Sequence, residues 1–216
     1  MPNRSPRLVQ RYPLVKVGKN TIIGEFTTIG KPYRPVRGQH SQSIETRIGR
    51  NCWIGNYVTV GKGAIISDGC ILDNYARIEE NVFIGQGTRV IYGSHICNKA
   101  KIGRGCVIGG FVCERAILED NVRTFGSLVH AHYAMDEWDE AEEEPSPKIG
   151  HDSVVSFGAL VIGGVLVGPR SYVCAGAIVR KKNVSPRFIA WNVRNRIHYT
   201  KWKGELRKSP IFRGKI

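Results

Sequence analysis

The chain has 216 residues, with 32 Lys and Arg against 18 Asp and Glu, a formal net charge of +14 and a pI near 9.8. This length suits one domain, or one domain with a small appendage. A hydrophobic content of 42% with 23% charged residues excludes wholesale disorder. No apolar run approaches the roughly 18 residues of a membrane span, and residues 1–7 lack the apolar core of a signal peptide. We therefore expect no membrane insertion. The basic balance leaves nucleic acid, an anionic membrane surface and a phosphorylated ligand open as partners.

A repeat of six residues follows the N-terminal segment 1–16. It begins at Val17, Ile23 and Ile29 and is broken by the irregular segment 31–47. From residue 48, eleven consecutive positions spaced six apart are Ile, Leu or Val, namely Ile48, Ile54, Val60, Ile66, Leu72, Ile78, Ile84, Val90, Ile96, Ile102 and Ile108. Chance gives such a run on the order of once in ten million. After a second break at 130–148 the repeat resumes at Ile149, Val155, Val161, Val167, Val173 and Val179.

A period of six fits neither an α-helix nor a β-hairpin. Gly often follows the aliphatic residue, Asn or Gly often stands three places after it, and a small or β-branched residue stands four places after it. Asn and Gly adopt a positive φ at little cost, so they indicate a tight turn in every unit. We predict short strands and turns, three sides to a coil of about 18 residues. Roughly seven coils then stack at the ~4.8 Å spacing of paired strands.

The unit Ile54-Gly-Asn-Tyr-Val-Thr59 resembles the hexapeptide-repeat acyltransferases, which include sugar and aminosugar acetyltransferases. The resemblance covers about residues 17–197. It implies an all-β fold, a left-handed parallel β-helix over 17–184 with a basic C-terminal extension at 185–216, and a homotrimer with its ligand groove between neighbouring subunits. Left-handed coils are an exception to the usual crossover rule. The same fold also serves carbonic anhydrases and non-enzymatic scaffold subunits, so fold alone does not give the activity.

The cysteines do not form a pattern that indicates a metal site. Cys52, Cys70 and Cys106 occupy the small inward column of the repeat, and no C-x-x-C pair occurs. We therefore expect reduced structural thiols, a cytoplasmic location and no bound metal. The carbonic anhydrase interpretation is disfavoured, because that family separates two ligand histidines by four residues, whereas His130 and His132 are separated by one.

The irregular segment 130–148 is the first candidate functional element. A loop of this length between rigid coils is more often functional than decorative. The resemblance implies a loop extruded late in the helix with a catalytic His at its base. We take His132 as the first candidate for the general base and His130 as the second. Two alternatives stay open: both histidines merely cap the coil, or the acceptor amine needs no enzymic base. Asp136 and Glu137 are candidates for attracting a cationic amine acceptor.

The second candidate element is the basic C-terminal part, where residues 180–216 hold twelve basic residues against Glu205 alone. The segment 174–186, which leads into this basic part, resembles the ending of the acyltransferase helix. The residues that follow depart from the usual Ala-Gly-Asn-Pro-Ala, because Trp191 stands in place of the Gly and Val193 in place of the Pro. The resemblance implies acetyl-CoA as the acyl donor. Basic side chains suit its phosphates, and small residues let its pantetheine arm approach the coils. The candidate residues are Gly158, Gly176, Ala177, Arg180, Lys181, Lys182 and Arg187.

Together these features predict a coenzyme A-dependent acyltransferase that moves an acetyl group to the amino group of a nucleotide-linked amino sugar. The close alternative is O-acetylation of a sugar or an antibiotic. An alternative from another class is a non-catalytic β-helix subunit of a larger assembly. The segment Tyr199–Gly204 interleaves aromatic residues with Lys as single-strand binders do, but no nucleic-acid-binding module accompanies it, so we expect no nucleic-acid partner.

Overall fold

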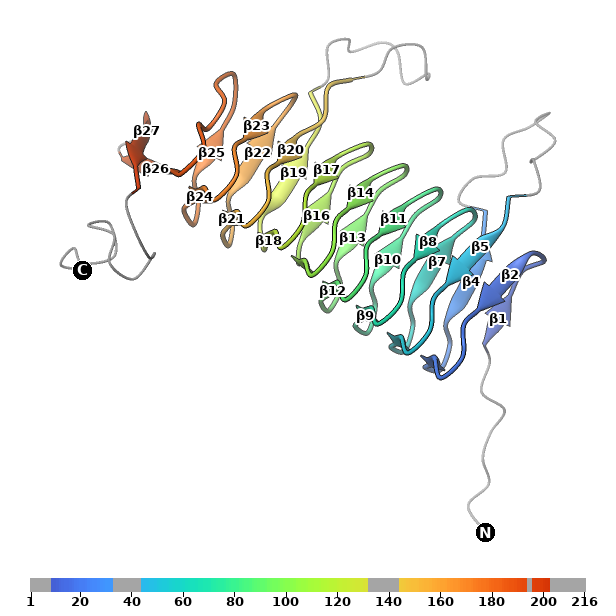
Figure 1. The fold of residues 1–216 in the computed structure, drawn as a ribbon. Coiled ribbons are helices and arrows are strands. Elements are labelled where there is room, and N and C mark those ends of the chain that lie inside the picture. The colour runs from blue at the N-terminus through green and yellow to red at the C-terminus, as the bar shows by residue number, and fades with distance from the viewer. Residues whose placement is uncertain (1–8, 33–43, 132–143, 194–195, 203–216) are drawn as a thin grey trace.

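The computed structural model describes residues 9–32, 44–131, 144–193 and 196–202. Every regular element in these ranges is a β-strand, and almost all strands are two or three residues long. Within the same ranges there is no apolar helix of the length that a bilayer crossing requires. Figure 1 shows the strands arranged as successive coils of a three-sided prism.

The strands form three sheets, and each coil adds one strand to each sheet. Sheet A contains β1 (Gln10–Arg11), β4 (Thr28–Lys31), β7 (Thr59–Gly61), β10 (Arg77–Ile78), β13 (His95–Ile96), β16 (Phe111–Val112), β19 (Ser127–Val129), β22 (Leu160–Ile162) and β25 (Ile178–Val179). Sheet B contains β2 (Val15–Val17), β5 (Thr46–Ile48), β8 (Ile65–Ile66), β11 (Phe83–Ile84), β14 (Lys101–Ile102), β17 (Ile117–Leu118), β20 (Lys148–Ile149) and β23 (Leu166–Val167). Sheet C contains β3 (Ile22–Ile23), β6 (Trp53–Ile54), β9 (Ile71–Leu72), β12 (Arg89–Val90), β15 (Val107–Ile108), β18 (Arg123–Thr124), β21 (Val154–Val155), β24 (Tyr172–Val173), β26 (Phe188–Val193) and β27 (Arg196–Lys201).

The predicted left-handed parallel β-helix is confirmed. All pairings between coils are parallel and join strands that lie three apart in the chain, except in the last coil, where β24 pairs with β26 because the side between them is a single bridge at Val184. The one antiparallel pair among the described strands is the terminal hairpin of β26 and β27. The chain runs from sheet A to B to C and back to A. We call the three lines of turns between the sheets the A/B, B/C and C/A edges.

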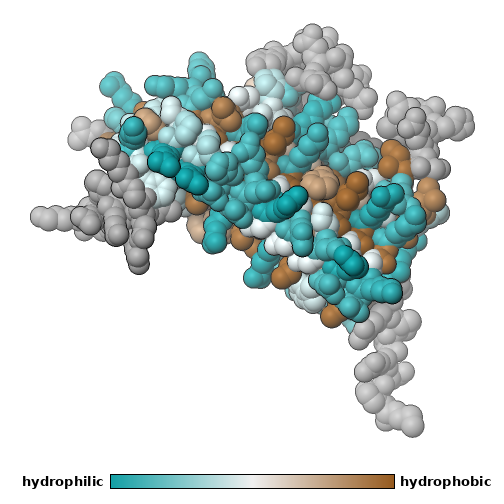
Figure 2. Space-filling model, in the orientation of Figure 1, coloured by the Kyte–Doolittle hydropathy of each residue, from teal (hydrophilic) through white to brown (hydrophobic). Residues whose placement is uncertain are grey.

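The predicted aliphatic column forms the core of the prism. Ile54, Leu72 and Ile84 have no exposed surface, and their counterparts in the later coils are also buried, whereas Val17 and Ile23 of the first coil are only partly buried. The residue before each of them faces outward, as the alternation of side chains along a strand requires. Burying an aliphatic side chain of this size stabilises the fold by about 1.5–3 kcal/mol, and most coils contribute three. On the face seen in Figure 2, hydrophilic residues cover most of the surface, with hydrophobic ones between them.

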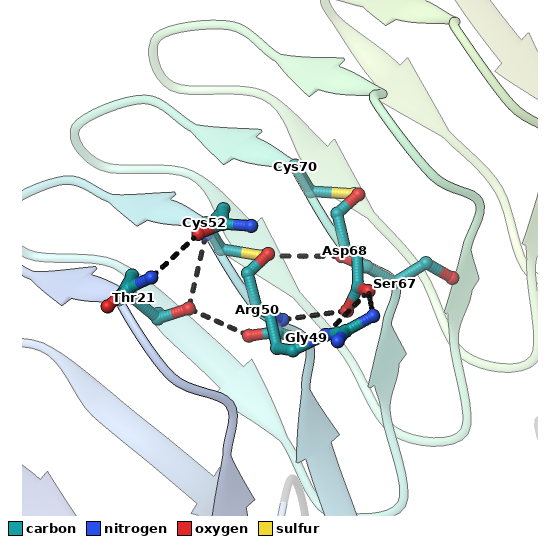
Figure 3. Close-up of polar contacts among 9 residues, drawn as sticks. Thr21, Gly49, Arg50, Cys52, Ser67, Asp68 and Cys70 are labelled. Carbon is teal, nitrogen blue, oxygen red and sulfur yellow. Dashed lines mark hydrogen bonds and ion pairs between the residues drawn. The ribbon is translucent and has the colours of Figure 1, made fainter.

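The second inward column, at the turns, holds small or β-branched residues, and the Thr, Ser and Cys side chains among them donate a hydrogen bond to the next coil. The Cys52 thiol donates to the Ser67 carbonyl at 3.2 Å, and the Thr21 hydroxyl donates to the Gly49 carbonyl at 2.7 Å (Figure 3). Cys70 and Cys106 make the same contact one or more coils further on, each at 3.2 Å. All six cysteines are free thiols. These three therefore act as small hydrogen-bond donors of the coil framework.

An aromatic ladder follows the C/A edge. The rings of Phe26, Tyr57 and Tyr75 stack with 5.0 Å between successive centroids. All three residues have a positive φ, near +55°, +57° and +62°. A bulky residue adopts this conformation at a cost, so the stacking of each ring on the next offsets part of the strain.

Two successive coils are each two residues shorter than the predicted 18. Arg77 pairs with His95, 18 positions on, but His95 pairs with Phe111, only 16 positions on, and Phe111 pairs with Ser127 after another 16. In each of these coils the C/A turn is two residues shorter, at Gly109–Gly110 in the first and at Phe125–Gly126 in the second. Gly110 has φ of +77°, and a Cβ there would collide with the carbonyl oxygen of Gly126. Glycine thus allows a turn with two fewer residues while the core column continues.

Both long interruptions of the repeat leave the helix at the A/B edge. One runs between β4 and β5 and the other between β19 and β20. The first coil includes residues before Val17, because β1 pairs with β4 and β2 pairs with β5.

One prediction concerns two buried threonines that differ in whether the hydroxyl is hydrogen-bonded. The Thr88 hydroxyl donates to the Gly103 carbonyl at 2.8 Å and accepts from the Cys106 N–H at 3.0 Å. The Thr124 hydroxyl stands in the aliphatic column, between Ile108 and Val155, and has no hydrogen-bond partner among the described residues. We expect Thr124→Val to stabilise the protein by about 1–2 kcal/mol and Thr88→Val to destabilise it by a similar amount. The thermal midpoint should therefore move up by a few degrees in the first variant and down in the second. A fall in both midpoints would contradict the prediction.

Candidate active site at the A/B edge

The A/B edge carries a column of residues in the position directly after the core aliphatic residue of each sheet A strand. From one end of the helix to the other this column holds Gly30, Gly61, Glu79, Cys97, Cys113, Val129, Ile162 and Arg180. Because successive sheet A strands pair in register, neighbouring members of the column lie one coil apart. The edge therefore brings together ionisable residues that are far apart in the sequence.

His130 lies at the foot of the second interruption, directly after β19. Its Nε2 is 3.0 Å from a carboxylate oxygen of Glu144, and both side chains are about a quarter exposed, at 26% and 27%. Two contacts hold this foot in place. The Ala131 N–H donates to the Pro145 carbonyl at 3.4 Å, and the Ser146 hydroxyl donates to the Glu114 carbonyl at 2.6 Å.

Three of the predicted site residues lie outside the described residues, namely His132, Asp136 and Glu137. Of the two candidate bases, His130 is the one whose surroundings are described. Its contact with Glu144 was not predicted, although Glu144 ends the acidic run that the sequence places in this loop.

The predicted basic residues Arg180, Lys181 and Lys182 follow β25 on the same edge. They are exposed, and they lie two coils beyond His130, since sheet A runs β19, β22, β25. The ammonium of Lys182 is 5.0 Å from the centre of the Tyr199 ring, a cation–π contact with the terminal hairpin.

Gly163 is the residue between these two groups. It has φ of +71°, its N–H donates to the Val129 carbonyl at 2.8 Å, and a Cβ there would lie 3.3 Å from the Cβ of Ala131. The absence of a side chain therefore lets the foot of the loop pass close to the next coil.

The other predicted cofactor residues lie on different edges of the same chain. Gly158 and Gly176 are neighbours at the C/A edge, where the Gly176 N–H donates to the Phe157 carbonyl at 3.0 Å. Ala177 is fully buried in the core, so in the single chain it is not open to a ligand. Arg187 is exposed at the B/C edge, directly before β26. Within one chain the structure thus brings Arg180, Lys181 and Lys182 together and separates the remaining four from them.

A second group on the A/B edge was not predicted. His95, on β13, points its Nε2 at an oxygen of Glu79 at 2.6 Å, and Glu79 is only 5% exposed. Cys97 Sγ is 3.8 Å from the same Nε2. Burial, and after it the charge of Glu79, raises the pKa of the Cys97 thiol to about 12. One signal in the sequence could have indicated part of this group. Glu79 and Cys97 are 18 positions apart, the length of one coil, and they stand in the repeat column in which Gly61 stands one coil earlier.

A shallow groove of about 760 Å³ follows the B/C edge, with Arg47, Gly85 and Asp120 among its lining residues. It exists because this edge carries a column of glycines at which the coils approach closely. A Cβ on Gly103, for example, would lie 2.6 Å from the Glu119 carbonyl carbon. None of the predicted site residues lines it.

Comparison with known proteins agrees with this fold. The family model described as bacterial transferase hexapeptide (six repeats) matches residues 45–80. UDP-N-acetylglucosamine acyltransferase from Francisella novicida is similar in structure, with a TM-score of 0.51 and 19% identity over 89% of this chain and 68% of that one. The repeat and the fold are those of the hexapeptide-repeat acyltransferases.

Two further solved structures are less similar. UDP-N-acetylglucosamine acyltransferase from Campylobacter jejuni has a TM-score of 0.46 and 16% identity over 90% of this chain and 73% of that one. A maltose O-acetyltransferase from Clostridium difficile has a TM-score of 0.35 and 22% identity over 58% of this chain and 60% of that one.

The A/B edge thus combines an imidazole–carboxylate pair with a group of exposed cations. A carboxylate beside an imidazole fixes the orientation of the ring. Exposed cations two coils away offer binding groups for an anionic substrate.

Proposed function

We propose that the protein is a coenzyme A-dependent acyltransferase, which moves an acetyl group from acetyl-CoA to the amino group of a nucleotide-linked amino sugar. One observation carries the proposal. The His130–Glu144 pair stands at the foot of an insertion, on the same edge as Arg180, Lys181 and Lys182.

The imidazole has the role of a general base in this reaction. An amine attacks only in its neutral form, and as its nitrogen bonds to the thioester carbonyl carbon it must lose a proton, which the imidazole accepts. The C–S bond then breaks, and the departing coenzyme A thiolate takes the proton back from the imidazolium. Glu144 stabilises the imidazolium through the 3.0 Å contact with Nε2. His132 is the alternative base, and Asp136 and Glu137 are proposed to attract the cationic acceptor.

The basic end of the helix is the proposed site for the donor. From Gly150 to Trp202 the sequence has eight Lys and Arg residues and a single acid, Asp152. Such a surface suits the pyrophosphate and ribose phosphate of coenzyme A, with Arg180, Lys181 and Lys182 as the main contacts.

The remaining predicted donor contacts require a second subunit. Gly158, Gly176, Ala177 and Arg187 lie on other edges than Lys181, so a single chain does not present all of them to one ligand. We therefore propose a homotrimer, in which edges of neighbouring subunits line one groove. Six free thiols fit a reducing compartment, and we propose a cytoplasmic location.

The same base and donor geometry serves a hydroxyl acceptor, so O-acetylation of a sugar or an antibiotic is the alternative reaction. A panel of nucleotide-linked amino sugars and neutral sugars, each incubated with acetyl-CoA and followed by release of free thiol, distinguishes the two. A non-catalytic scaffold subunit releases no thiol with any acceptor and gives no calorimetric heat with millimolar acetyl-CoA.

Replacement of the loop histidines tests the general base. We expect His130→Asn to lower kcat by about 10²–10⁴-fold with little change in KM, because the proton transfer is lost and the binding surface is kept. His151→Asn is the matched control, since His151 also contacts a carboxylate, Asp152 at 2.9 Å, but lies at the B/C edge. His132→Asn is measured beside it. Near-normal turnover in both loop variants would exclude a histidine of this loop as the base.

Replacement of the basic residues tests the donor site. We expect the double variant Arg180→Ala, Lys181→Ala to raise KM for acetyl-CoA by roughly 10-fold or more, since each charged contact to a phosphate contributes about 1.5–3 kcal/mol. The control pair is Arg196→Ala, Lys201→Ala, which removes the same charge from the terminal hairpin. An equal rise in KM in both pairs would show general electrostatic attraction and would contradict a specific site after β25.

A further inference from the structure

The group formed by Glu79, His95 and Cys97 has a different chemical character from the rest of the A/B edge. A carboxylate oxygen, an imidazole nitrogen and a sulfur all lie within 4.8 Å of one another. We infer that these three residues form a binding site for Zn²⁺ or a similar transition-metal ion. The inference is independent of the proposed acyl transfer.

The separations of the donor atoms are close to those of a tetrahedral site. With a metal–sulfur distance of about 2.3 Å and a metal–nitrogen distance of about 2.05 Å, the sulfur and nitrogen of such a site lie about 3.6 Å apart. The observed distance between Cys97 Sγ and His95 Nε2 is 3.8 Å. The corresponding nitrogen–oxygen separation is about 3.3 Å, whereas Nε2 and the Glu79 oxygen share a hydrogen bond of 2.6 Å. The bound ion replaces this hydrogen bond, and the two groups move apart by less than an ångström.

The surroundings of the three residues hold them in place. The second oxygen of Glu79 accepts from the Asn98 N–H at 3.2 Å, so the carboxylate is tied to the next coil. The edge of the His95 ring packs against Phe111, with 5.4 Å between the centroids and planes nearly perpendicular. Glu79 is buried, while His95 and Cys97 are part-exposed, so an ion reaches the site from the surface.

Ion binding affects three neighbouring groups: the proton of the Cys97 thiol, the ring proton of His95 and the Arg77 guanidinium. The thiol of Cys97 loses its proton, because the thiolate is the ligand, and the imidazole proton occupies Nδ1 so that Nε2 is free to coordinate. The Arg77 guanidinium is 3.4 Å from the Glu79 oxygen and its side chain is 44% exposed. It therefore has room to turn into solvent as the positive ion takes its place.

The donor set indicates which ion fits. Sulfur and imidazole nitrogen favour Zn²⁺ and related transition metals over Mg²⁺ and Ca²⁺, which prefer oxygen. Three protein ligands leave a fourth position for water or a substrate oxygen, as in catalytic zinc sites. The sequence predicted no metal because it has no C-x-x-C pair. Here the ligands come from neighbouring coils, 16 and 18 residues apart.

Cobalt substitution tests the site in the full, tag-free chain. The chelator-treated protein is titrated with Co²⁺ and followed by absorption. We expect one Co²⁺ per chain with a thiolate-to-cobalt charge-transfer band in the near ultraviolet. Cys97→Ser should abolish that band, and His95→Gln or Glu79→Gln should weaken Co²⁺ affinity by roughly 100-fold or more. Cys113→Ser is the matched control, because Cys113 occupies the same column one coil further and belongs to no such cluster in the described residues. It should keep the band.

A second measurement does not depend on the folding of variants. Zn²⁺ at 100 times its Kd should raise the Tm of the unaltered chain by roughly 5–10 °C, since the ion binds only the folded site. Absence of a charge-transfer band in the unaltered chain, a band that persists in Cys97→Ser, or an unchanged Tm with Zn²⁺ would each overturn the inference.

Discussion

Each coil is held to the next by backbone hydrogen bonds between parallel strands, and the register of this pairing determines where every side chain lies. Because Arg77 pairs with His95 and Phe83 with Lys101, a side chain has its nearest lateral neighbours one coil earlier and one coil later. The aliphatic column then packs into one continuous core. The same register creates continuous columns along the edges, and these columns carry the chemistry.

The edges differ in what their columns contain. The B/C edge is a line of glycines that lets the coils approach closely, and the C/A edge carries stacked aromatic rings such as Tyr57 and Tyr75. The A/B edge collects both interruptions of the repeat, two imidazole–carboxylate pairs and a run of cations. Of the imidazole–carboxylate pairs in the described residues, two lie on the A/B edge and one, His151–Asp152, on the B/C edge. The proposed reaction and the proposed metal site both use the A/B edge, where the cations also lie.

The core and the fold class were predictable from the sequence because a strict period of six leaves few structures that bury residues such as Ile78 and Ile84 together. The site was predictable only in part. The loop and its His130 were visible as a break in the repeat, but the contact with Glu144 depends on the path of the chain at the foot of the loop. The group around His95 was missed because its residues are not close together in the sequence, although Glu79 and Cys97 stand one regular 18-residue coil apart. Coil length changes from 18 to 16 only after this group, at Gly110, where glycine permits a shorter turn.

The two short coils have a consequence for how such a molecule changes over evolution. At Gly109–Gly110 and Phe125–Gly126 two residues are missing from the turn, yet Ile96, Val112 and Leu128 still stack in the core. Length variation is therefore absorbed at the corners, and the strands on either side keep their partners. A lineage of such proteins is free to lengthen, shorten or replace one corner and so acquire a new surface group without redesigning the interior. The core and the strand pairing thus stay constant, while each corner can vary independently of the others.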